Sequence, residues 1–155
     1  MPTLDLDFGD VGKMPPEGVW RILIKSAILK QNKAKDGQII DFEAEFMDMP
    51  DPSYEGFKIF PNPNASLKPT ARWKLQEVLG AITQEDWSDD NMKLEVNGPD
   101  DAEPYHIPLL EGKTSLIVFV HDTYNNKPSM KVDTWIPDNG EVTIGETVSP
   151  DGSVV

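Results

Sequence analysis

Residues 38–47 contain an alternation of apolar and polar side chains, unbroken from Ile40 to Phe46, which constrains the fold more than any other feature of the sequence. The apolar members fall on one side of an extended chain: Ile40, Phe42, Ala44 and Phe46. The acidic members fall on the other side: Asp41, Glu43 and Glu45. Because successive side chains of a strand point to opposite faces, this segment is predicted to be a strand with one core face and one acidic, solvated face.

A partner strand is predicted directly upstream, over residues 19–29, where apolar residues occupy both faces at first and Arg21 and Lys25 share one of them. The residues that join the two strands are rich in lysine and end in Asp36-Gly37, which is typical of tight hairpin turns. We therefore expect an antiparallel hairpin. The 14 prolines and 11 glycines also favour short strands and loops over a helical bundle.

The later elements complete a familiar order. Residues 57–60 are predicted to form a short third strand that ends at Pro61, and residues 114–122 and 129–136 a second hairpin. Apolar residues recur at helical spacing between these elements and predict an amphipathic helix over about residues 68–82: Ala71, Leu75, Val78, Leu79 and Ile82. This order is typical of the OB-fold, so we predict a mainly β, five-stranded Greek-key barrel with one helix between strands 3 and 4.

The two ends of the chain differ from the predicted barrel, which occupies residues 19–136. Residues 1–18 are punctuated by glycine and proline and have no sustained hydrophobic period, so they are predicted to be an extended arm. Residues 137–155 contain four acidic residues, no basic residue and no packing pattern. We therefore expect a disordered, flexible acidic tail.

Several sequence features bear on where the protein acts. The N-terminus lacks the basic and apolar regions of a signal peptide, and the longest apolar run, residues 116–120, is too short to cross a bilayer. The chain has no cysteine, which excludes disulfides and thiolate metal sites. A cytoplasmic protein with no membrane partner is the expectation.

The formal net charge of −13 disfavours a nucleic-acid partner when it is taken alone. The charges are segregated, however: residues 19–35, 57–74 and 112–131 are net positive and hold twelve of the fourteen basic side chains. In an OB-fold, oligonucleotides bind the face of strands 2 and 3 and the loops that join strands 1–2 and 4–5. The positive blocks contain the third strand and both of these loops, which favours a nucleic-acid ligand.

Short patterns along residues 14–137 resemble phage-encoded single-stranded DNA-binding proteins of the OB-fold type. These patterns are Pro-Glu-Gly-Val-Trp-Arg-Ile at 16–22, Asp-Phe-Glu-Ala-Glu-Phe at 41–46, Ala-Arg-Trp-Lys-Leu at 71–75, Leu-Gly at 79–80 and Tyr-Asn-Asn-Lys-Pro at 124–128. The resemblance implies a protein that coats single-stranded DNA during phage replication or recombination and recruits other replication or recombination proteins through an acidic tail. The tail here departs from the family pattern, because its acids are spread out and its tip is Gly-Ser-Val-Val.

Single-strand binders combine lysines or arginines that follow the phosphates with aromatic rings that stack on bases. The basic candidates for the nucleic-acid site are Arg21, Lys25, Lys30, Lys33, Lys35, Lys58, Lys68, Arg72, Lys74, Lys127 and Lys131. The aromatic candidates that lie close to these cations are Phe57, Trp73 and Tyr124, with Trp135 as a further ring, whereas Trp20 and Phe60 are expected in the core. The acidic outer face of residues 38–47 argues against a path across that strand.

The sequence contains no Ser-His-Asp order, no glycine-rich phosphate loop and no spaced histidine pair, so no enzyme, cofactor or metal site is predicted. Two other functions remain open. The strong negative charge is compatible with an acidic interaction protein, such as a DNA mimic that inhibits a basic partner. A virion structural or assembly protein that associates through its hairpin edges is the other alternative.

Overall fold

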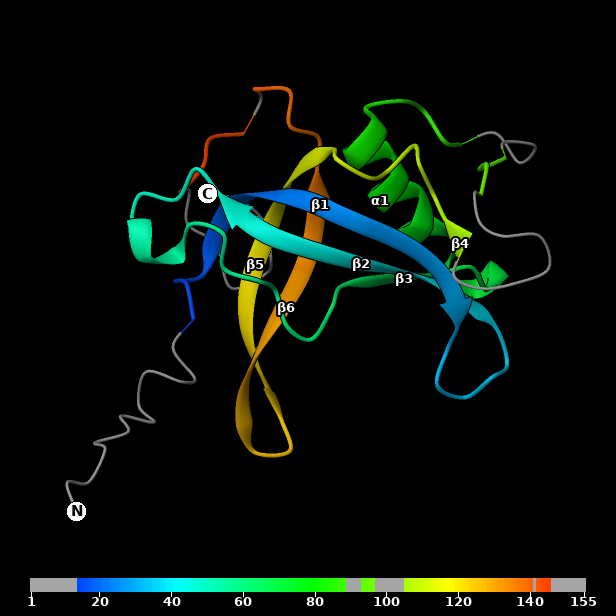
Figure 1. Cartoon of the computed structure of the whole chain (residues 1–155), viewed down its shortest axis with the longest axis horizontal. Helices are drawn as coiled ribbons and strands as arrows, with labels where there is room; N and C mark the ends of the chain where they lie inside the picture. Colours follow the sequence, from blue (N-terminus) through cyan, green and yellow to red (C-terminus); the bar gives the residue numbers. More distant parts are fainter. Residues whose placement is uncertain (1–13, 89–92, 97–104, 141, 146–155) are drawn as a thin grey trace, which may run out of the picture.

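A computed structural model describes residues 14–88, 93–96, 105–140 and 142–145, and these form a mainly β structure with one short helix (Figure 1). The strands are β1 (Gly18–Gln31), β2 (Gln38–Met47), β3 (Asn64–Ser66), β4 (Tyr105–His106), β5 (Thr114–Tyr124) and β6 (Lys127–Ile136). The helix is α1 (Arg72–Thr83), and Pro52–Tyr54 and Pro69–Ala71 form single 3₁₀ turns. All pairings are antiparallel, in the order β3-β2-β1-β5-β6, with β4 also paired to β1. The mainly β prediction is therefore confirmed.

The first hairpin matches its prediction closely. Strand β2 has the predicted bounds, and its apolar side is buried: Ile40, Phe42, Ala44 and Phe46. Strand β1 is longer than predicted and contains an irregularity between Ile24 and Ser26, where its register with β2 shifts. The extra length carries both strands beyond the sheet, so that the loop between them projects from the body of the protein (Figure 1).

The third strand lies later in the chain than predicted. Residues 57–60 form only one isolated bridge, between Lys58 and Glu45, while β3 pairs with the start of β2. Prolines at positions 61 and 63 have no N–H to donate, and this explains why the ladder is interrupted between the bridge and β3. Residues 57–60 thus contact the sheet through this bridge, but the prediction that they form a regular third strand is wrong.

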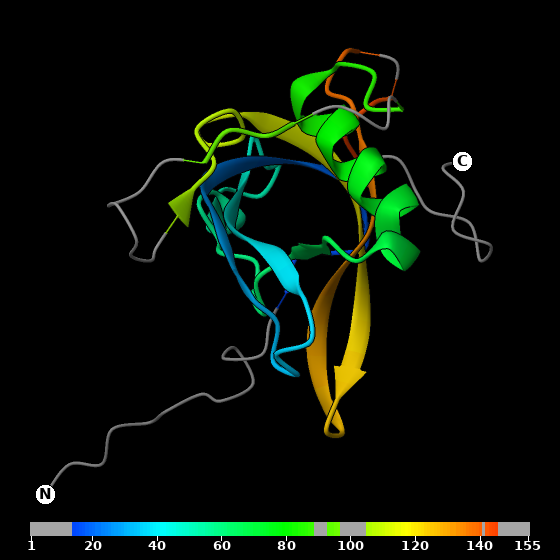
Figure 2. The ribbon, with the colours of Figure 1, turned by 90° about the vertical axis from the view of Figure 1, so that its right-hand side faces the viewer.

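Helix α1 confirms the predicted helix, with its first turn replaced by the 3₁₀ turn that starts at Pro69. Its buried side chains are Val78, Leu79, Ala81 and Ile82. Figure 2 shows the sheet curling into a ring, with α1 lying along one side of it. The helix contacts β3, β5 and β6 and so covers the region between the two ends of the sheet order.

Aromatic pairs join the two halves of the curled sheet. The ring centroids of Phe42 on β2 and Trp135 on β6 are 5.4 Å apart, and those of Phe46 on β2 and Phe119 on β5 are 5.2 Å apart in an edge-to-face arrangement. All four side chains are buried. The core therefore lies inside the ring, between the first hairpin and the second.

The segment after β6 corrects the predicted tail. Val142 and Ile144 pack against a second apolar cluster on the outside of the sheet, formed by Val19, Leu116 and Val118. The backbone N–H of Gly145 donates to the Val19 carbonyl at 2.7 Å. Burial of this outer cluster explains why the chain stays on the sheet, and a flexible tail that begins at residue 137 is therefore wrong. Residues 146–155 of the predicted tail lie outside the described residues.

The predicted N-terminal arm is described only from Met14 onward. Pro16 accepts a hydrogen bond from Trp20 Nε1 at 2.7 Å, and a Glu17 carboxylate oxygen accepts one from the His121 backbone N–H at 2.8 Å. Residues 14–17 are thus held against β1 and β5. Across the described ranges, no helix has the length and apolarity needed to cross a membrane.

Asp138 ties this outer segment to the sheet. Its carboxylate accepts hydrogen bonds from Arg21 at 2.7 and 3.1 Å and from the Thr114 hydroxyl at 3.2 Å. Arg21 also pairs with Asp48 at 2.6 Å, which links β1, β2 and the segment after β6. The hydrogen bonds from Arg21 hold the pKa of the Asp138 carboxyl below its usual value.

We expect Asp138→Asn to lower the free energy of unfolding at about pH 7 by roughly 1–3 kcal/mol, because a charged hydrogen-bond acceptor is lost. A carboxyl whose pKa is lowered by folding stabilises the protein above its unfolded-state pKa, and this contribution disappears as the pH falls through the folded-state pKa. The loss of stability that urea unfolding measures for Asp138→Asn should therefore be larger at about pH 7 than at about pH 3. Asp122→Asn, at an exposed position on β5, is the matched control, and a difference for Asp138→Asn that is equal at both pH values would contradict this role.

Candidate nucleic-acid interface

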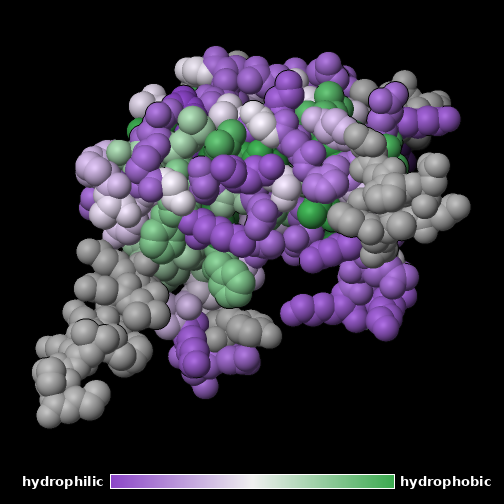
Figure 3. All heavy atoms as spheres, viewed as in Figure 1, coloured by the Kyte–Doolittle hydropathy of each residue, from purple (hydrophilic) through white to green (hydrophobic). Residues whose placement is uncertain are grey.

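Two hairpin ends project from the same side of the protein: the loop between β1 and β2, and the far end of the β5–β6 hairpin (Figure 1). The segment that connects β2 to β3 passes between them in this view. In Figure 3 both ends are strongly hydrophilic, and apolar side chains lie on the face between them. The following residues build this surface.

The β1–β2 loop has a fixed backbone and exposed lysines. Asn32 Nδ2 donates to Asp36 Oδ1 at 2.7 Å, the Asp36 N–H donates back to Asn32 Oδ1 at 3.2 Å, and the Asn32 N–H donates to the Gly37 carbonyl at 3.0 Å. Lys35 has a left-handed backbone with φ 59°, which completes the turn. Because the loop closes on itself, the side chains of Lys33 and Lys35 point into solvent and are exposed.

The β5–β6 hairpin ends in a two-residue turn at Asn125 and Asn126, whose φ values are 51° and 63°. Two consecutive positive φ values are typical of the type I′ turn, which matches the twist of the flanking strands and which asparagine tolerates. Lys127 and Lys131 lie on the outer strand of this hairpin and are exposed. Tyr124 lies in β5 beside the turn, but its side chain is outside the described residues.

These four lysines differ from most other basic candidates. Lys33, Lys35, Lys127 and Lys131 have no salt bridge within the described part of the chain, and they sit at the two projecting ends. The other candidates with a carboxylate partner within 4 Å are Arg21 with Asp48 and Asp138, Lys30 with Asp41, Lys58 with Glu43, Lys68 with Asp36 and Lys74 with Glu77. Arg72 also has an interaction partner, and Lys25 is exposed on β1 near Glu43.

The acidic face of β2 is largely neutralised by these pairs. Lys30 Nζ lies 3.4 Å from Asp41, and Lys58 Nζ lies 3.2 Å from Glu43. The hydrogen bond from Lys58 lowers the pKa of Glu43, which therefore stays ionised and paired. Of the three acids on this face, only Glu45 has no salt bridge among the described residues. The argument from sequence against a path across β2 is thereby weakened.

The aromatic candidates separate into exposed and buried rings. Trp73 is 67% exposed, while Trp20 and Trp135 are buried, as is typical of core residues. Phe57 is half-buried and packs edge-on against Tyr54, with the ring centroids 6.0 Å apart. Lys74 Nζ lies 5.8 Å from the centre of the Trp73 ring, so this helix end combines a cation with an open aromatic face.

Phe60 corrects the sequence prediction, because it is 70% exposed rather than part of the core. It lies on the segment between β2 and β3, next to the bridge at Lys58. The sequence pattern around Phe60 could have predicted this exposure. Ile59 is apolar and buried. In an extended chain its neighbours Lys58 and Phe60 must then share the opposite, outward side. An exposed phenylalanine next to a lysine is a residue pair that suits base stacking and phosphate contact.

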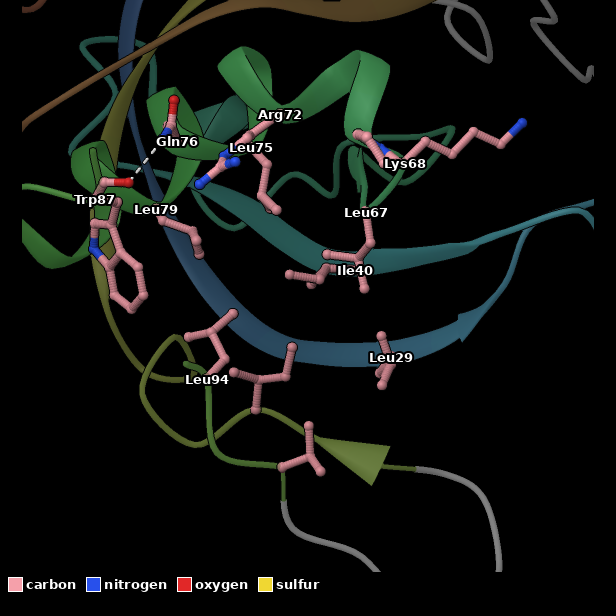
Figure 4. Close-up of a pocket in the computed structure, with 13 residues that line it drawn as sticks. Leu29, Ile40, Leu67, Lys68, Arg72, Leu75, Gln76, Leu79, Trp87 and Leu94 are labelled. Carbon is pink, nitrogen blue, oxygen red and sulfur yellow. Dashed lines mark hydrogen bonds between the residues drawn. The ribbon is translucent and has the colours of Figure 1, made fainter. Parts of the chain in front are cut away.

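A pocket of about 440 Å³ lies elsewhere, between α1 and the strands β1 and β2 (Figure 4). Aliphatic side chains form most of its lining: Leu29, Ile40, Leu67, Leu75, Leu79, Leu94, Val96 and Ile107. Lys68, Arg72 and Gln76 contribute its polar groups, and Gln76 Nε2 already donates to the Trp87 carbonyl at 2.9 Å. Lys68 and Arg72 therefore belong to this pocket as well as to the list of basic candidates.

The chemistry of the remaining polar groups is limited. His106 Nδ1 lies 2.7 Å from Glu111, and a ring nitrogen of His121 lies 2.7 Å from the Pro15 carbonyl. No group of three or more metal-ligating side chains comes together in the ranges that the structure covers.

No protein-family model matches the chain, and a search of curated proteins finds no relative of it.

Proposed function

We propose that this chain folds as an OB-like barrel and binds single-stranded DNA without catalysis and with little sequence preference. The strand order is β3-β2-β1-β5-β6, and α1 lies between β3 and β5 in the chain. This is the order of an OB-fold barrel that has been opened between the strands at the two ends of the order, here β3 and β6. The β1–β2 loop and the β5–β6 hairpin then correspond to the two loops that flank the ligand face in such folds. The observation that carries the proposal is that both hairpin ends project to one side and bear exposed lysines that have no salt bridge among the described residues.

The charges support a path between the two ends. The four exposed lysines there have no carboxylate partner in the described part of the chain, so binding to phosphate does not require an existing ion pair to break. Lysine suits this role because its ammonium group contacts phosphate as a point charge on a flexible stem, independent of sequence. Protein-wide repulsion from the net charge of −13 makes such local cation clusters necessary and should make binding sensitive to salt.

Aromatic rings supply the second part of a single-strand site. Phe60 is exposed on the segment that passes between the two hairpin ends, and Trp73 is exposed at the start of α1, which contacts both β3 and β6. Stacking of a base on an aromatic ring contributes roughly 1–3 kcal/mol and tolerates every base. Two open rings, Phe60 two residues from Lys58 and Trp73 beside Lys74, therefore support single-stranded rather than double-stranded DNA as the ligand.

The resemblance to phage single-stranded DNA-binding proteins supports a role in phage DNA replication or recombination in the host cytoplasm. In that role the chain coats exposed single strands, and its acidic C-terminal residues recruit replication or recombination proteins. Residues 146–155, which contain Glu146 and Asp151, are the segment that carries this part of the proposal.

Fluorescence anisotropy of a labelled oligo(dT) tests the ligand. We expect saturable binding to an oligo(dT) of about thirty nucleotides, which is longer than the roughly 4–16 nucleotides that one OB-fold covers. With four phosphate contacts, the slope of log affinity against log salt should be about −3. A duplex of the same length should bind more weakly. Absence of binding at about 50 mM salt would overturn the proposal and favour the acidic interaction protein as the function.

Intrinsic fluorescence provides a second test, because only one of the four tryptophans is open to a base. Trp73 is 67% exposed, whereas Trp20, Trp87 and Trp135 are each at most 8% exposed. We expect oligo(dT) to quench the wild-type emission and Trp73→Phe to remove most of that change while binding is retained. Equal quenching in wild type and Trp73→Phe would exclude Trp73 from the binding path.

A further inference from the structure

The pocket between α1 and the first hairpin adjoins the β1–β2 loop, where Lys68 on its rim pairs with Asp36, and it has no role so far (Figure 4). Leu29 of β1, Ile40 of β2, and Leu75 and Leu79 of α1 contribute aliphatic surface to it, and its volume of about 440 Å³ falls in the range of ligand-binding pockets. A pocket of this lining gains free energy mainly by taking up aliphatic or aromatic side chains.

The rim of the pocket is cationic. Figure 4 shows the Arg72 guanidinium directed toward the pocket, while Lys68 lies at its edge with its ammonium group pointing outward. Both cations already have partners, and that of Lys68 is Asp36 at 2.8 Å, in a pair whose two side chains are exposed. Exposed ion pairs contribute little to stability, so an incoming carboxylate can share or replace the Asp36 partner of Lys68 at small cost.

A nucleobase is a poorer occupant than an aliphatic segment. Its polar edge needs acceptors as well as donors, yet Gln76 is the one side chain of the described lining that can accept a hydrogen bond, and its amide already donates to the Trp87 carbonyl. A buried polar group left without a partner costs roughly 1–3 kcal/mol, which offsets the gain from burial. The pocket therefore suits apolar side chains accompanied by carboxylates.

The chain itself contains such a segment. Leu4, Leu6 and Phe8 alternate with Asp5 and Asp7. When such a sequence is extended, its three apolar side chains fall on one side and its two carboxylates on the other. These are the two chemical features that the pocket and its rim would recognise.

We propose that residues 4–8 of one copy of the chain bind in this pocket of a second copy. A copy's own segment is too short to place all three of its apolar side chains in its own pocket, because Met14 lies beside Trp20 at the start of β1, while Leu29 at the end of β1 lines the pocket, roughly 30 Å further along the strand. Phe8 can extend at most about 22 Å from Met14. Each copy then donates one segment and accepts another, and such a head-to-tail interface produces a ring or an open row of copies.

Sedimentation velocity without DNA tests this inference, which does not depend on the proposed function. We expect the full-length chain to associate as its concentration rises. The double variant Leu6→Ser with Phe8→Ser should lower the association constant at least tenfold for each apolar side chain lost. Leu75→Trp, which fills the pocket, should have the same effect, whereas Leu109→Trp, at an exposed position outside the pocket, should not.

A mixing experiment makes the test decisive and guards against misfolding of the filled-pocket variant. The Leu6→Ser/Phe8→Ser chain retains an intact pocket, and the Leu75→Trp chain retains an intact segment. We expect the two variants, each monomeric alone, to form a one-to-one complex when mixed. A wild-type chain that stays monomeric at all concentrations, or variants that fail to complement each other, would overturn the inference.

Discussion

Phe42→Ala is expected to lower the free energy of unfolding by about 3–5 kcal/mol, the range for truncation of a fully buried aromatic side chain. Phe42 has no exposed surface, and its ring lies 5.4 Å from that of Trp135 on the opposite side of the curled sheet. The substitution therefore removes contacts between the first and the second hairpin in addition to opening a cavity. Urea unfolding followed by circular dichroism measures the loss.

Phe60→Ala is the matched control for this prediction. It removes the same side chain at a position that is 70% exposed, so we expect a change within about 0.5 kcal/mol. A loss below about 1 kcal/mol for Phe42→Ala would contradict the packing of β2 against β6, since an isolated hairpin would not bury this ring.

Replacement of the four lysines at the hairpin ends should have the largest effect on DNA binding. The quadruple variant converts Lys33, Lys35, Lys127 and Lys131 to Gln, which keeps the side chains polar and removes four positive charges. At about 0.1 M salt we expect a loss of affinity for oligo(dT) of roughly a hundredfold to a thousandfold, because each phosphate contact contributes about 0.7 to the salt slope. The remaining binding should depend much less on salt.

A pair of lysines outside these ends tests whether position or only net charge matters. Lys93 and Lys113 are exposed and have no salt bridge in the described ranges. Changing both to Gln should alter affinity less than about threefold, whereas Lys33→Gln with Lys127→Gln, an equal change in charge, should cost roughly twentyfold. Equal losses for the two pairs would mean that the hairpin ends have no special role.

The elements that were predictable from the sequence are those whose local pattern and tertiary environment agree. Strand β2 was predicted to the residue because its alternation is complete and a turn precedes it. Strand β3 has only three residues, and its pairing with the start of β2 depends on the path that the intervening prolines impose. The outer segment after β6 was not predictable, because Val142 and Ile144 are isolated apolar residues and the cluster that they cover forms only in the folded sheet.

The candidate site was predictable in part. The charge blocks led to the hairpin lysines, since both loops project far enough to keep these side chains in solvent. Which cations are already paired was not predictable, because the partners are distant in sequence: Arg21 and Asp138 are 117 residues apart. Phe60 is exposed although it is hydrophobic, because its alternation with buried Ile59 places it on the outward side of the chain.

Hydrogen exchange with and without oligo(dT) tests the central claim, that the two hairpin ends form one single-stranded DNA site. Exposed loops and turns exchange quickly in a free protein, so contact with a ligand is detected as slower exchange there. We predict slower exchange in both the β1–β2 loop and the β5–β6 turn when oligo(dT) is added at low salt, and reversal of both at high salt. Binding that leaves these two ends unchanged, or that protects only one of them, would contradict the claim.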